Sequence, residues 1–466
     1  MSELPVGWAY AALSDLLTDA GIFTDGDWIE SKDQDPSGEN RLLQLADIGD
    51  GKFINKSSRY VNDETFNRLN CTTLKEGDLL IARMPDPLGR ACLMPKLPQR
   101  CLTVVDVAVF RSGNKNIDQR WLMHTINASP VRSEIWRNSS GTTRKRISRG
   151  KLSELRIPVP PTAEQKRIAQ KLDALLAQVD ALKGRIDAIP TLLKRLRRTA
   201  ISSELSNQGS DKWDVCSVAD LCAVAFDGPF GSKLRSNDYT GTGVRVVRLE
   251  NIGHLNFIGE KVTYVSPQKG NELSKNQLLE GDILFSSFVD EEIRVCQLPR
   301  SKESFINKAD CFCLRIDPKL ANPKFVMFAL SSQDTYRKIR ASVHGATRPR
   351  INLRFLKSFE LRLPPIDQQN EIVHRIEQLF AIADQLETKV TTARNRINAL
   401  TESLLAKAFH GKLVPQDPND EPASALLERI HTQHAVAPSQ SVAASASRHA
   451  REESSNPVVY NMNSAR

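Results

Sequence analysis

A long stripe of hydrophobic residues, spaced alternately four and three apart, runs through the first half of the chain and recurs in the second half. The two copies lie at a constant offset, since 372 − 168 = 204 and 404 − 200 = 204. The predicted seam positions are Ile168, Leu172, Leu175, Val179, Leu182 and Ile186, followed in the second copy by Ile372, Ile376, Leu379, Ala383, Leu386 and Val390. An apolar repeat of about 3.5 residues under-winds a helix and is buried only against another such helix. The pattern therefore predicts two long helices, each of which needs a helical partner.

The same offset of 204 residues holds outside the helices. LKEGDLLIAR at 74–83 matches LLEGDILFSS at 278–287, and GTTRKRISRGKLSELRIPVPP at 141–161 matches GATRPRINLRFLKSFELRLPP at 345–365. Short runs such as GDLLIAR and ELRIPVP have the composition of strands, whereas 121–136 and 325–339 have helical spacing. The sequence thus predicts a tandem duplication of the α/β class, in which each repeat is a mixed globular half followed by a long helix.

Proline pairs separate each globular half from its helix. Pro160-Pro161 and Pro364-Pro365 end a strand, because proline cannot donate to a ladder, and Thr162 with Gln165 predicts a capping box directly afterwards. Pro190, inside the first helix only, is expected to bend it. The predicted domains are a globular domain at 1–160, a helix at 161–210, a second globular domain at 211–364, a second helix at 365–414, and a short helix with a disordered tail at 415–466.

The lengths favour an intramolecular, antiparallel pairing of the two helices. A helix of about 40 residues is about 60 Å long, whereas a globular half of this size is about 40 Å across. The second half is attached to the end of the first helix and to the start of the second, and only antiparallel helices bring those two points together. We expect a dumbbell-like arrangement with a pseudo-two-fold axis. Coiled-coil dimerisation between two chains is the alternative.

Signatures of catalysis are scarce in this sequence. It contains no GxxxxGK[ST] phosphate loop, no HExxH and no GxSxG, and the eight histidines do not recur at matched positions in the two repeats. The eight cysteines lack metal-ligand spacing, so neither a zinc site nor a disulfide framework is expected. There is no signal peptide or apolar run long enough to span a membrane, which predicts a cytoplasmic protein.

The feature that recurs in both halves is a set of basic loops. The formal net charge of +9 is consistent with an anionic polymer as partner, and a glycine-led loop can present guanidinium groups to phosphates or to guanine edges. A merely solvated basic loop is the alternative interpretation. The candidate DNA-binding residues are Arg83, Arg90, Arg144, Lys145, Arg146, Arg149 and Lys151 in the first half, and Ser232, Lys233, Arg235, Arg348, Arg350 and Arg354 in the second.

Three longer motifs resemble the specificity subunit of type I restriction-modification systems. LRIPVPPTAEQKRIAQKLDALLAQVDALKGRIDAIPTLLKRLRR is similar to the central region of that family. LRLPPIDQQNEIVHRIEQLFAIADQLETKV, together with SLLAKAFHGKLVPQDPNDEPASALLERI, is similar to its C-terminal region. DGPFGSKLRSNDY with VRVVRLENIG resembles the opening of a target-recognition domain, and the first half departs from this motif with IFTDGDWIESKDQDPSGEN.

The resemblance implies that each globular half is a target-recognition domain reading one half of a bipartite, asymmetric site in double-stranded DNA, with the paired helices fixing the spacer. It implies a non-catalytic subunit that binds no cofactor or metal itself. Two modification subunits, which methylate adenine, and the restriction subunits would be its partners, and S-adenosylmethionine, Mg and ATP would be bound by them. A DNA adenine methyltransferase with built-in recognition, or a coiled-coil adaptor without DNA affinity, are the alternatives. The first would need a Pro-Pro-aromatic signature, but Thr162 and Ile366 follow the proline pairs.

Overall fold

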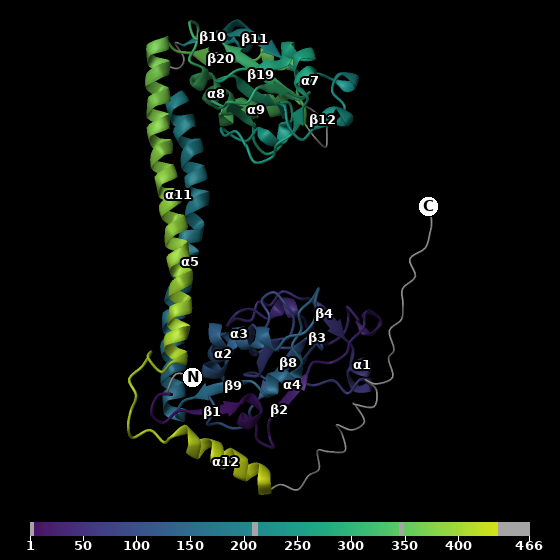
Figure 1. Ribbon diagram of the computed structural model, residues 1–466, viewed down its shortest axis with the longest axis vertical. Helices are drawn as coiled ribbons and strands as arrows, with labels where there is room; N and C mark the ends of the chain where they lie inside the picture. The colour runs from purple at the N-terminus through teal and green to yellow at the C-terminus, as the bar shows by residue number, and fades with distance from the viewer. Residues whose placement is uncertain (1–3, 207–212, 344–348, 437–466) are drawn as a thin grey trace. The chain divides into compact units, whose positions relative to one another are not determined.

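The computed structural model describes residues 4–206, 213–343 and 349–436. It divides into two compact units (Figure 1). Unit 1 comprises residues 1–184 and 395–466, and unit 2 comprises 185–394. The boundary between the units therefore passes through both long helices, α5 (Thr162–Leu205) and α11 (Ile366–Phe409). The finer domain limits given above remain a prediction. Within the described ranges no helix is long and apolar enough to cross a membrane.

Unit 1 is built around an antiparallel sheet in the order β2-β8-β5-β6, with a three-stranded sheet β4-β3-β7 and a pair β1-β9. The strands of unit 1 are β1 (Ala9–Ala12), β2 (Ile22–Asp25), β3 (Asn40–Leu43), β4 (Arg59–Val61), β5 (Leu79–Ala82), β6 (Ala91–Leu93), β7 (Cys101–Thr103), β8 (Val107–Arg111) and β9 (Arg156–Val159). Its shorter helices are α1 (Asp63–Arg68), α2 (Gln119–Asn127), α3 (Ser129–Arg137), α4 (Arg149–Ser153) and α12 (Ala423–Val436).

Unit 2 repeats this plan, with the sheet order β11-β19-β16-β17, a five-stranded sheet β12-β14-β13-β18-β15 and a pair β10-β20. Its strands are β10 (Asp214–Ser217), β11 (Cys222–Phe226), β12 (Tyr239–Thr240), β13 (Val244–Val247), β14 (Tyr264–Val265), β15 (Gln277–Leu278), β16 (Ile283–Ser286), β17 (Val295–Gln297), β18 (Phe305–Asn307), β19 (Cys311–Ile316) and β20 (Glu360–Leu363). Its shorter helices are α6 (Val218–Leu221), α7 (Pro267–Glu272), α8 (Pro323–Ser331), α9 (Gln333–Ser342) and α10 (Leu353–Lys357). The duplication read from the sequence is thus a duplication of the fold.

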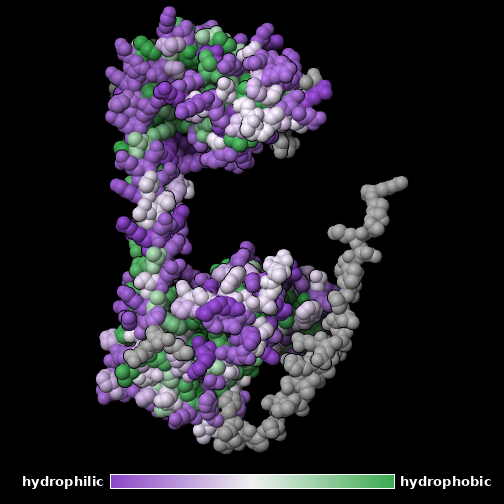
Figure 2. All heavy atoms as spheres, viewed as in Figure 1, coloured by the Kyte–Doolittle hydropathy of each residue, from purple (hydrophilic) through white to green (hydrophobic). Residues whose placement is uncertain are grey.

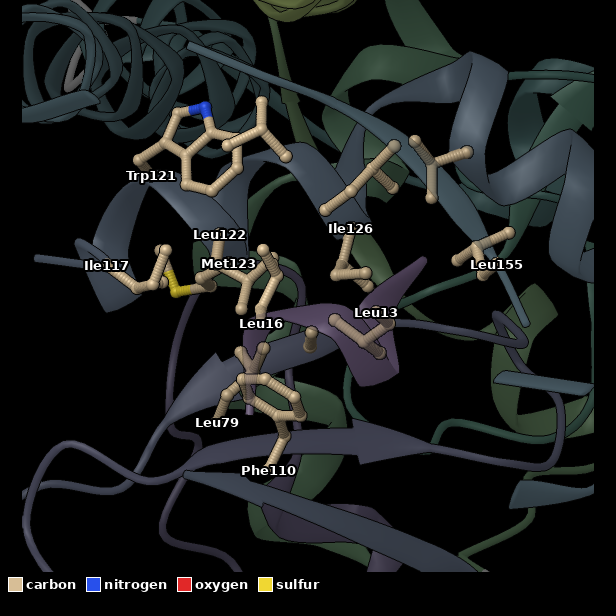
Figure 3. Close-up of a cluster of buried hydrophobic side chains, with 14 of the residues drawn as sticks. Leu13, Leu16, Leu79, Phe110, Ile117, Trp121, Leu122, Met123, Ile126 and Leu155 are labelled. Atoms are coloured by element: carbon tan, nitrogen blue, oxygen red, sulfur yellow. The ribbon is translucent and has the colours of Figure 1, made fainter. Parts of the chain in front are cut away.

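The main core of unit 1 lies between its four-stranded sheet and α2. Leu79 and Phe110 from the sheet, Leu13 and Leu16 from the segment after β1, and Leu122 from α2 are all fully buried there (Figure 3). Helix α12 joins the same core, because Leu426 and Ile430 are buried in it. The short helix expected within 415–466 is therefore present at Ala423–Val436, while residues 437–466 lie outside the described parts of the structure.

The long helices pair within the chain and run antiparallel. In unit 1 the start of α5 shares a core with the end of α11, through Leu172 and Ala408. In unit 2 the residue numbers of the ion pairs run in opposite directions: Arg394 contacts Asp187 at 2.6 Å, and Arg375 contacts Glu204 at 2.8 Å. Figure 1 shows the two helices alongside one another. Helix α5 remains helical through Pro190.

Two of the predicted seam positions are wrong. Leu182 and its counterpart Leu386 are 46% and 39% exposed, whereas Val179 and Val390 are buried. In α11 the residue after Leu386, Glu387, is half-buried, and the half-buried Arg197 of α5 donates to both of its carboxylate oxygens at 2.9 and 3.1 Å. Ion pairs therefore flank the apolar seam.

Ile168, Leu172, Ile372, Ile376 and Ala383 are also buried, while Leu175, Ile186 and Leu379 are half-buried.

Gln165 does not cap its own helix as expected, and Gln369, its counterpart after the second proline pair, makes the same contacts. The side-chain oxygen of Gln165 accepts a hydrogen bond from the backbone N–H of Asp118 at 3.0 Å, and its amide donates to the carbonyl of Pro160 at 3.0 Å. Gln369 makes the same two bonds, with Asn322 and Pro364 at 2.8 Å. Both glutamines are buried. Because Asp118 and Asn322 are the N-caps of α2 and α8, each glutamine fixes a long helix to the globular part of its unit.

Candidate nucleic-acid interface

In unit 1 a buried arginine at the end of β5 ties three loops together. Arg83 is 5% exposed, and its guanidinium lies 2.5 Å from the carboxylate of Asp25, the last residue of β2. It also donates to the carbonyl oxygens of Val105 at 3.1 Å and Ile147 at 2.9 Å. Burial lowers the pKa of Arg83, and the neighbouring Asp25 opposes that change. The bases of the loops at 26–39, 83–90 and 140–147 are therefore held at one place.

Unit 2 has the corresponding junction with different chemistry. Ser287 occupies the position of Arg83 and donates to Asp310 at 3.0 Å, while Arg350 forms an ion pair with the same carboxylate. The carboxylate of Asp227 accepts from the backbone N–H groups of Asp310 at 3.0 Å and Gly228 at 2.7 Å. Burial raises the pKa of Asp227, and these two backbone bonds oppose the rise. Four hydrogen-bonding side chains thus join the loop after β11, the loop before β19 and the loop before α10.

A glycine is required where the first loop leaves each junction. A Cβ atom on Gly26 would lie 2.1 Å from the carbonyl oxygen of Val104, and one on Gly228 would lie 2.0 Å from the carbonyl carbon of Lys308. Such contacts are far inside van der Waals distance, so no larger residue fits without a backbone shift. The Asp-Gly step therefore packs the base of the loop directly onto the backbone of the neighbouring strand segment.

Several of the predicted basic residues are exposed near these junctions. Arg149 and Lys151 lie on α4, which Ser148 caps, and Arg354 lies on α10, which Asn352 caps. The exposed candidates are Arg144, Arg149, Lys151, Lys233, Arg235, Arg350 and Arg354. Because α4 and α10 directly follow the junction loops in the two repeats, each unit presents a cluster of cations beside its junction.

The partners of these cations differ. Lys151 pairs with Glu154 at 2.9 Å, and Lys145 is half-buried with its ammonium 5.8 Å from the ring centre of Trp136. Arg146 is half-buried and lies 3.5 Å from Asp106. Arg348 and the side chain of Ser232 lie outside the described parts of the structure.

The prediction that Arg83 and Arg90 contact DNA is not supported by where they lie. Arg90 is 8% exposed, and its three guanidinium nitrogens donate to the carbonyls of Ile48, Pro87 and Leu45 at 2.6, 3.0 and 2.8 Å. Both arginines are occupied in holding loops of their own unit. A local sequence cannot distinguish a buried arginine from an exposed one, because the partners that bury it lie elsewhere in the chain.

The acidic members of the junctions were not predicted from the sequence. Asp106 and Asp310 are separated by the repeat offset of 204 residues, so the sequence repeat could have revealed this pair. Asp25 and Asp227 each precede a glycine at an offset of 202 residues, since 227 − 25 = 202, and unequal loop lengths obscure that match. In the ranges that the structure describes, no group of three or more His, Cys, Asp and Glu side chains is arranged to hold a metal ion. Exposed cations beside fixed loops are suited to contacts with phosphates.

Comparison with known proteins identifies the family. Residues 5–191 and 210–393 each match the model of the type I restriction modification DNA specificity domain. The chain belongs to this family.

Curated relatives agree with that assignment. The type I restriction enzyme EcoKI specificity subunit of Escherichia coli K12 is 31% identical over 362 residues, which cover 73% of this chain and 77% of that protein. The StySPI specificity subunit of Salmonella potsdam is 32% identical over 361 residues, with the same coverage. The chain is therefore a DNA sequence-specificity subunit and not a catalytic one. The comparisons do not support the alternative of a DNA adenine methyltransferase.

Solved structures share the fold. A chain from a study of complex assembly and conformational transition of the type I R-M system superposes with a TM-score of 0.68, at 19% identity, over 89% of this chain and all of that one. The HsdS subunit of Thermoanaerobacter tengcongensis gives a TM-score of 0.55 at 18% identity, over 88% of this chain and 98% of that one. This chain therefore shares its fold with both of those chains.

Proposed function

We propose that each unit reads one half of a bipartite, asymmetric site in double-stranded DNA through the loops of its junction, and that the paired helices set the spacer between the halves. The observation that carries the proposal is that the same loop junction occurs in both units. Its backbone plan is the same in both units, but Arg83 in one unit is replaced by Ser287 in the other. A shared scaffold with different loop chemistry is what two readers of different sequences require.

The exposed cations supply the affinity in this proposal. Arg149 on α4 and Arg354 on α10 are exposed beside the junctions of units 1 and 2. Each phosphate neutralised by such a side chain releases counterions, so the logarithm of the affinity falls with the logarithm of salt concentration with a slope of about −0.9 per contact. Phosphate contacts of this kind position a protein on DNA, whereas the junction loops read the bases.

Helices α5 and α11 have the properties of a spacer element. Helix α5 begins in unit 1 and ends in unit 2, whereas α11 begins in unit 2 and ends in unit 1. Arg197 contacts both Glu387 and Asp384 across the pair, which opposes sliding of one helix along the other. A fixed helix register would translate into a fixed number of unread base pairs.

The partners in the proposal are two modification subunits and the restriction subunits, which would bind S-adenosylmethionine, Mg and ATP, while this chain binds none of them. Exposed apolar side chains on both long helices of unit 2 support docking of other subunits. Leu192, Leu196, Ile382 and Leu386 are exposed there, and Figure 2 shows hydrophobic side chains reaching the surface along the helices. Contiguous exposed apolar side chains mark interaction surfaces in soluble proteins.

The test uses the chain in complex with its modification subunits, and the methylated positions in host DNA give the recognised site. Exchanging the loops at 23–41 and 81–90 for those of a relative should change one half-site only. Inserting seven residues in each helix lengthens the pair by about 10 Å and should lengthen the preferred spacer by about three base pairs. A change in both half-sites would contradict independent reading, and an unchanged spacer would contradict the role of the helices.

A further inference from the structure

Each unit exposes a large aromatic ring at the same place in the same loop. In unit 1 the sequence Asp-Gly-Asp-Trp ends with Trp28, and in unit 2 the sequence Asp-Gly-Pro-Phe ends with Phe230. Both rings follow the tightly packed glycine of the junction by two residues. Trp28 is 68% exposed and Phe230 is 54% exposed. The loops differ in length and charge, yet the aromatic ring is retained in both.

The backbone that carries Trp28 is held firmly. The N–H of Gly26 donates to the carbonyl of Val107 at 2.8 Å, and the N–H of Asp27 donates to that of Thr103 at 2.7 Å. The carboxylate of Asp27 in turn accepts from the N–H of Thr72 at 3.0 Å. A rigid base removes most of the ordering cost that a mobile loop would incur when its aromatic ring binds a partner.

The acidic residues beside Trp28 are already paired within unit 1. Glu30 forms an ion pair with Lys32 at 2.8 Å, and Asp33 forms one with Arg68 at 2.7 Å. The indole also borders a surface hollow of about 270 Å³ whose apolar lining includes Leu45 and Val104. The same hollow is also lined by the polar residues Asp27, Glu30, Gln44 and Asp106. The exposed ring itself is suited to a flat, uncharged surface, and the ion pairs of Glu30 and Asp33 limit repulsion of a nearby phosphate.

Phe230 has cations instead of acids beside it. The N–H of Lys233 donates to the carbonyl of Phe230 at 3.3 Å, which closes a tight turn, and both Lys233 and Arg235 are exposed. This arrangement places positive charge next to an exposed ring. Proteins that stack on bases combine these two features, since the cations follow the backbone while the ring takes the face of a base.

We propose that Trp28 and Phe230 are aromatic wedges, each of which stacks on a base at a locally unstacked step within the half-site that its unit reads. This inference rests on the proposed function and deepens it, because it assigns one contact residue per half-site. Base faces are the flat, uncharged surfaces that DNA offers, and side chains inserted between base steps unstack and kink the duplex. Stacking is tolerant of sequence, so the wedges contribute affinity and DNA shape, and the remaining junction loops supply base identity.

The experiment uses the full complex of this chain with its modification subunits and duplexes carrying the recognised site. The fluorescent base 2-aminopurine replaces one base at a time, and its emission rises where a base loses its stacking neighbours. Apart from the adenine that the modification subunits extrude for methylation, wild-type complex should raise the emission at one further step in each half-site. Trp28→Ala should abolish the rise in the half read by unit 1 only, Phe230→Ala in the other half only, and each should weaken binding about 5- to 150-fold.

Conservative and matched substitutions separate stacking from general damage. Trp28→Phe and Phe230→Trp should retain most of the affinity and emission, because each unit would then carry the ring type of the other. Leu320→Ala is the control, since Leu320 is similarly exposed in unit 2 but lies beyond the opposite end of β19 from Asp310. It should leave affinity and emission unchanged. All of these side chains are exposed, so unfolding by urea should be the same in every variant.

The outcomes distinguish this inference from the function on which it rests. Wild-type affinity and emission in both alanine variants would overturn the wedges while leaving sequence-specific binding intact. A wild-type complex that fails to discriminate its site from unrelated DNA would overturn the proposed function and the wedges together. Loss of the modification subunits from Trp28→Ala, with unaltered emission in the DNA that remains bound, would assign the ring to a protein contact and also refute the proposal.

Discussion

Replacing Arg83 by alanine separates a structural arginine from a DNA contact. The substitution leaves three groups without their partner: the carboxylate of Asp25 and the carbonyl oxygens of Val105 and Ile147. Removing one member of a buried pair costs about 3–5 kcal/mol, but the side chain of Asp25 is 33% exposed and regains water. We therefore expect a loss of about 3 kcal/mol in the free energy of unfolding of unit 1.

Tryptophan fluorescence during urea or thermal unfolding measures this loss. Four of the five tryptophans, Trp8, Trp28, Trp121 and Trp136, lie in unit 1, so the emission reports mainly on that unit. A loss of about 3 kcal/mol corresponds to a decrease of about 6–12 °C in the midpoint for a unit of this size. DNA binding should weaken only in the half-site read by unit 1, because the loops lose their common anchor.

The matched control is Arg149→Ala, which removes an exposed arginine from the same unit. Its free energy of unfolding should change by less than about 0.5 kcal/mol, and its salt dependence of DNA binding should become shallower by about one. The reasoning would be refuted if Arg83→Ala unfolded like the wild type and lost DNA affinity in the manner of Arg149→Ala. Arg83 would then be a direct contact, as the sequence first indicated.

Three further substitutions test the helices and the attachments of unit 1. Burial raises the pKa of Glu164 above its ordinary 4.5. At neutral pH the buried carboxylate is ionised and destabilises the fold. This destabilisation is lost as the pH falls below 4.5, where the carboxyl is protonated in both the folded and the unfolded chain. Glu164→Gln places in the first repeat the residue found at the matching position of the second, Gln368. The wild type should gain unfolding free energy when the pH is lowered from 7 to 4.5, and this gain should be smaller in the variant. An equal gain in both proteins would contradict the burial penalty of Glu164. Arg197→Ala should cost about 1–2 kcal/mol, and a double-mutant cycle with Glu387→Gln should give a coupling of about 0.5–1.5 kcal/mol that vanishes if the pair contributes nothing. Ile430→Ala should cost about 2–4 kcal/mol in urea unfolding followed by tryptophan fluorescence, and a loss below 1 kcal/mol would mean that α12 does not belong to the core of unit 1.

The architecture was readable from the sequence because it depends on periodicity. A seven-residue repeat and a constant offset survive substitution of individual residues, so they predicted two paired helices and two copies of one α/β plan. The basic residues on the loops after residues 141 and 345 could be predicted for the same reason, but their exposure could not. The seam at Leu182 and Leu386 could not be predicted either, since the rotation of a helix about its axis depends on how it packs along its whole length.

The sequence alone determined the duplication, the helix pair, the family and the basic loops, because each is a property of neighbouring residues or of a repeated spacing. Only the tertiary structure decided which arginines face solvent. Arg83 and Arg144 are both arginines in basic, turn-rich stretches, but Asp25, Val105 and Ile147 enclose the first and leave the second exposed. Burial arises from partners far away in the chain, and those partners meet only when the fold forms.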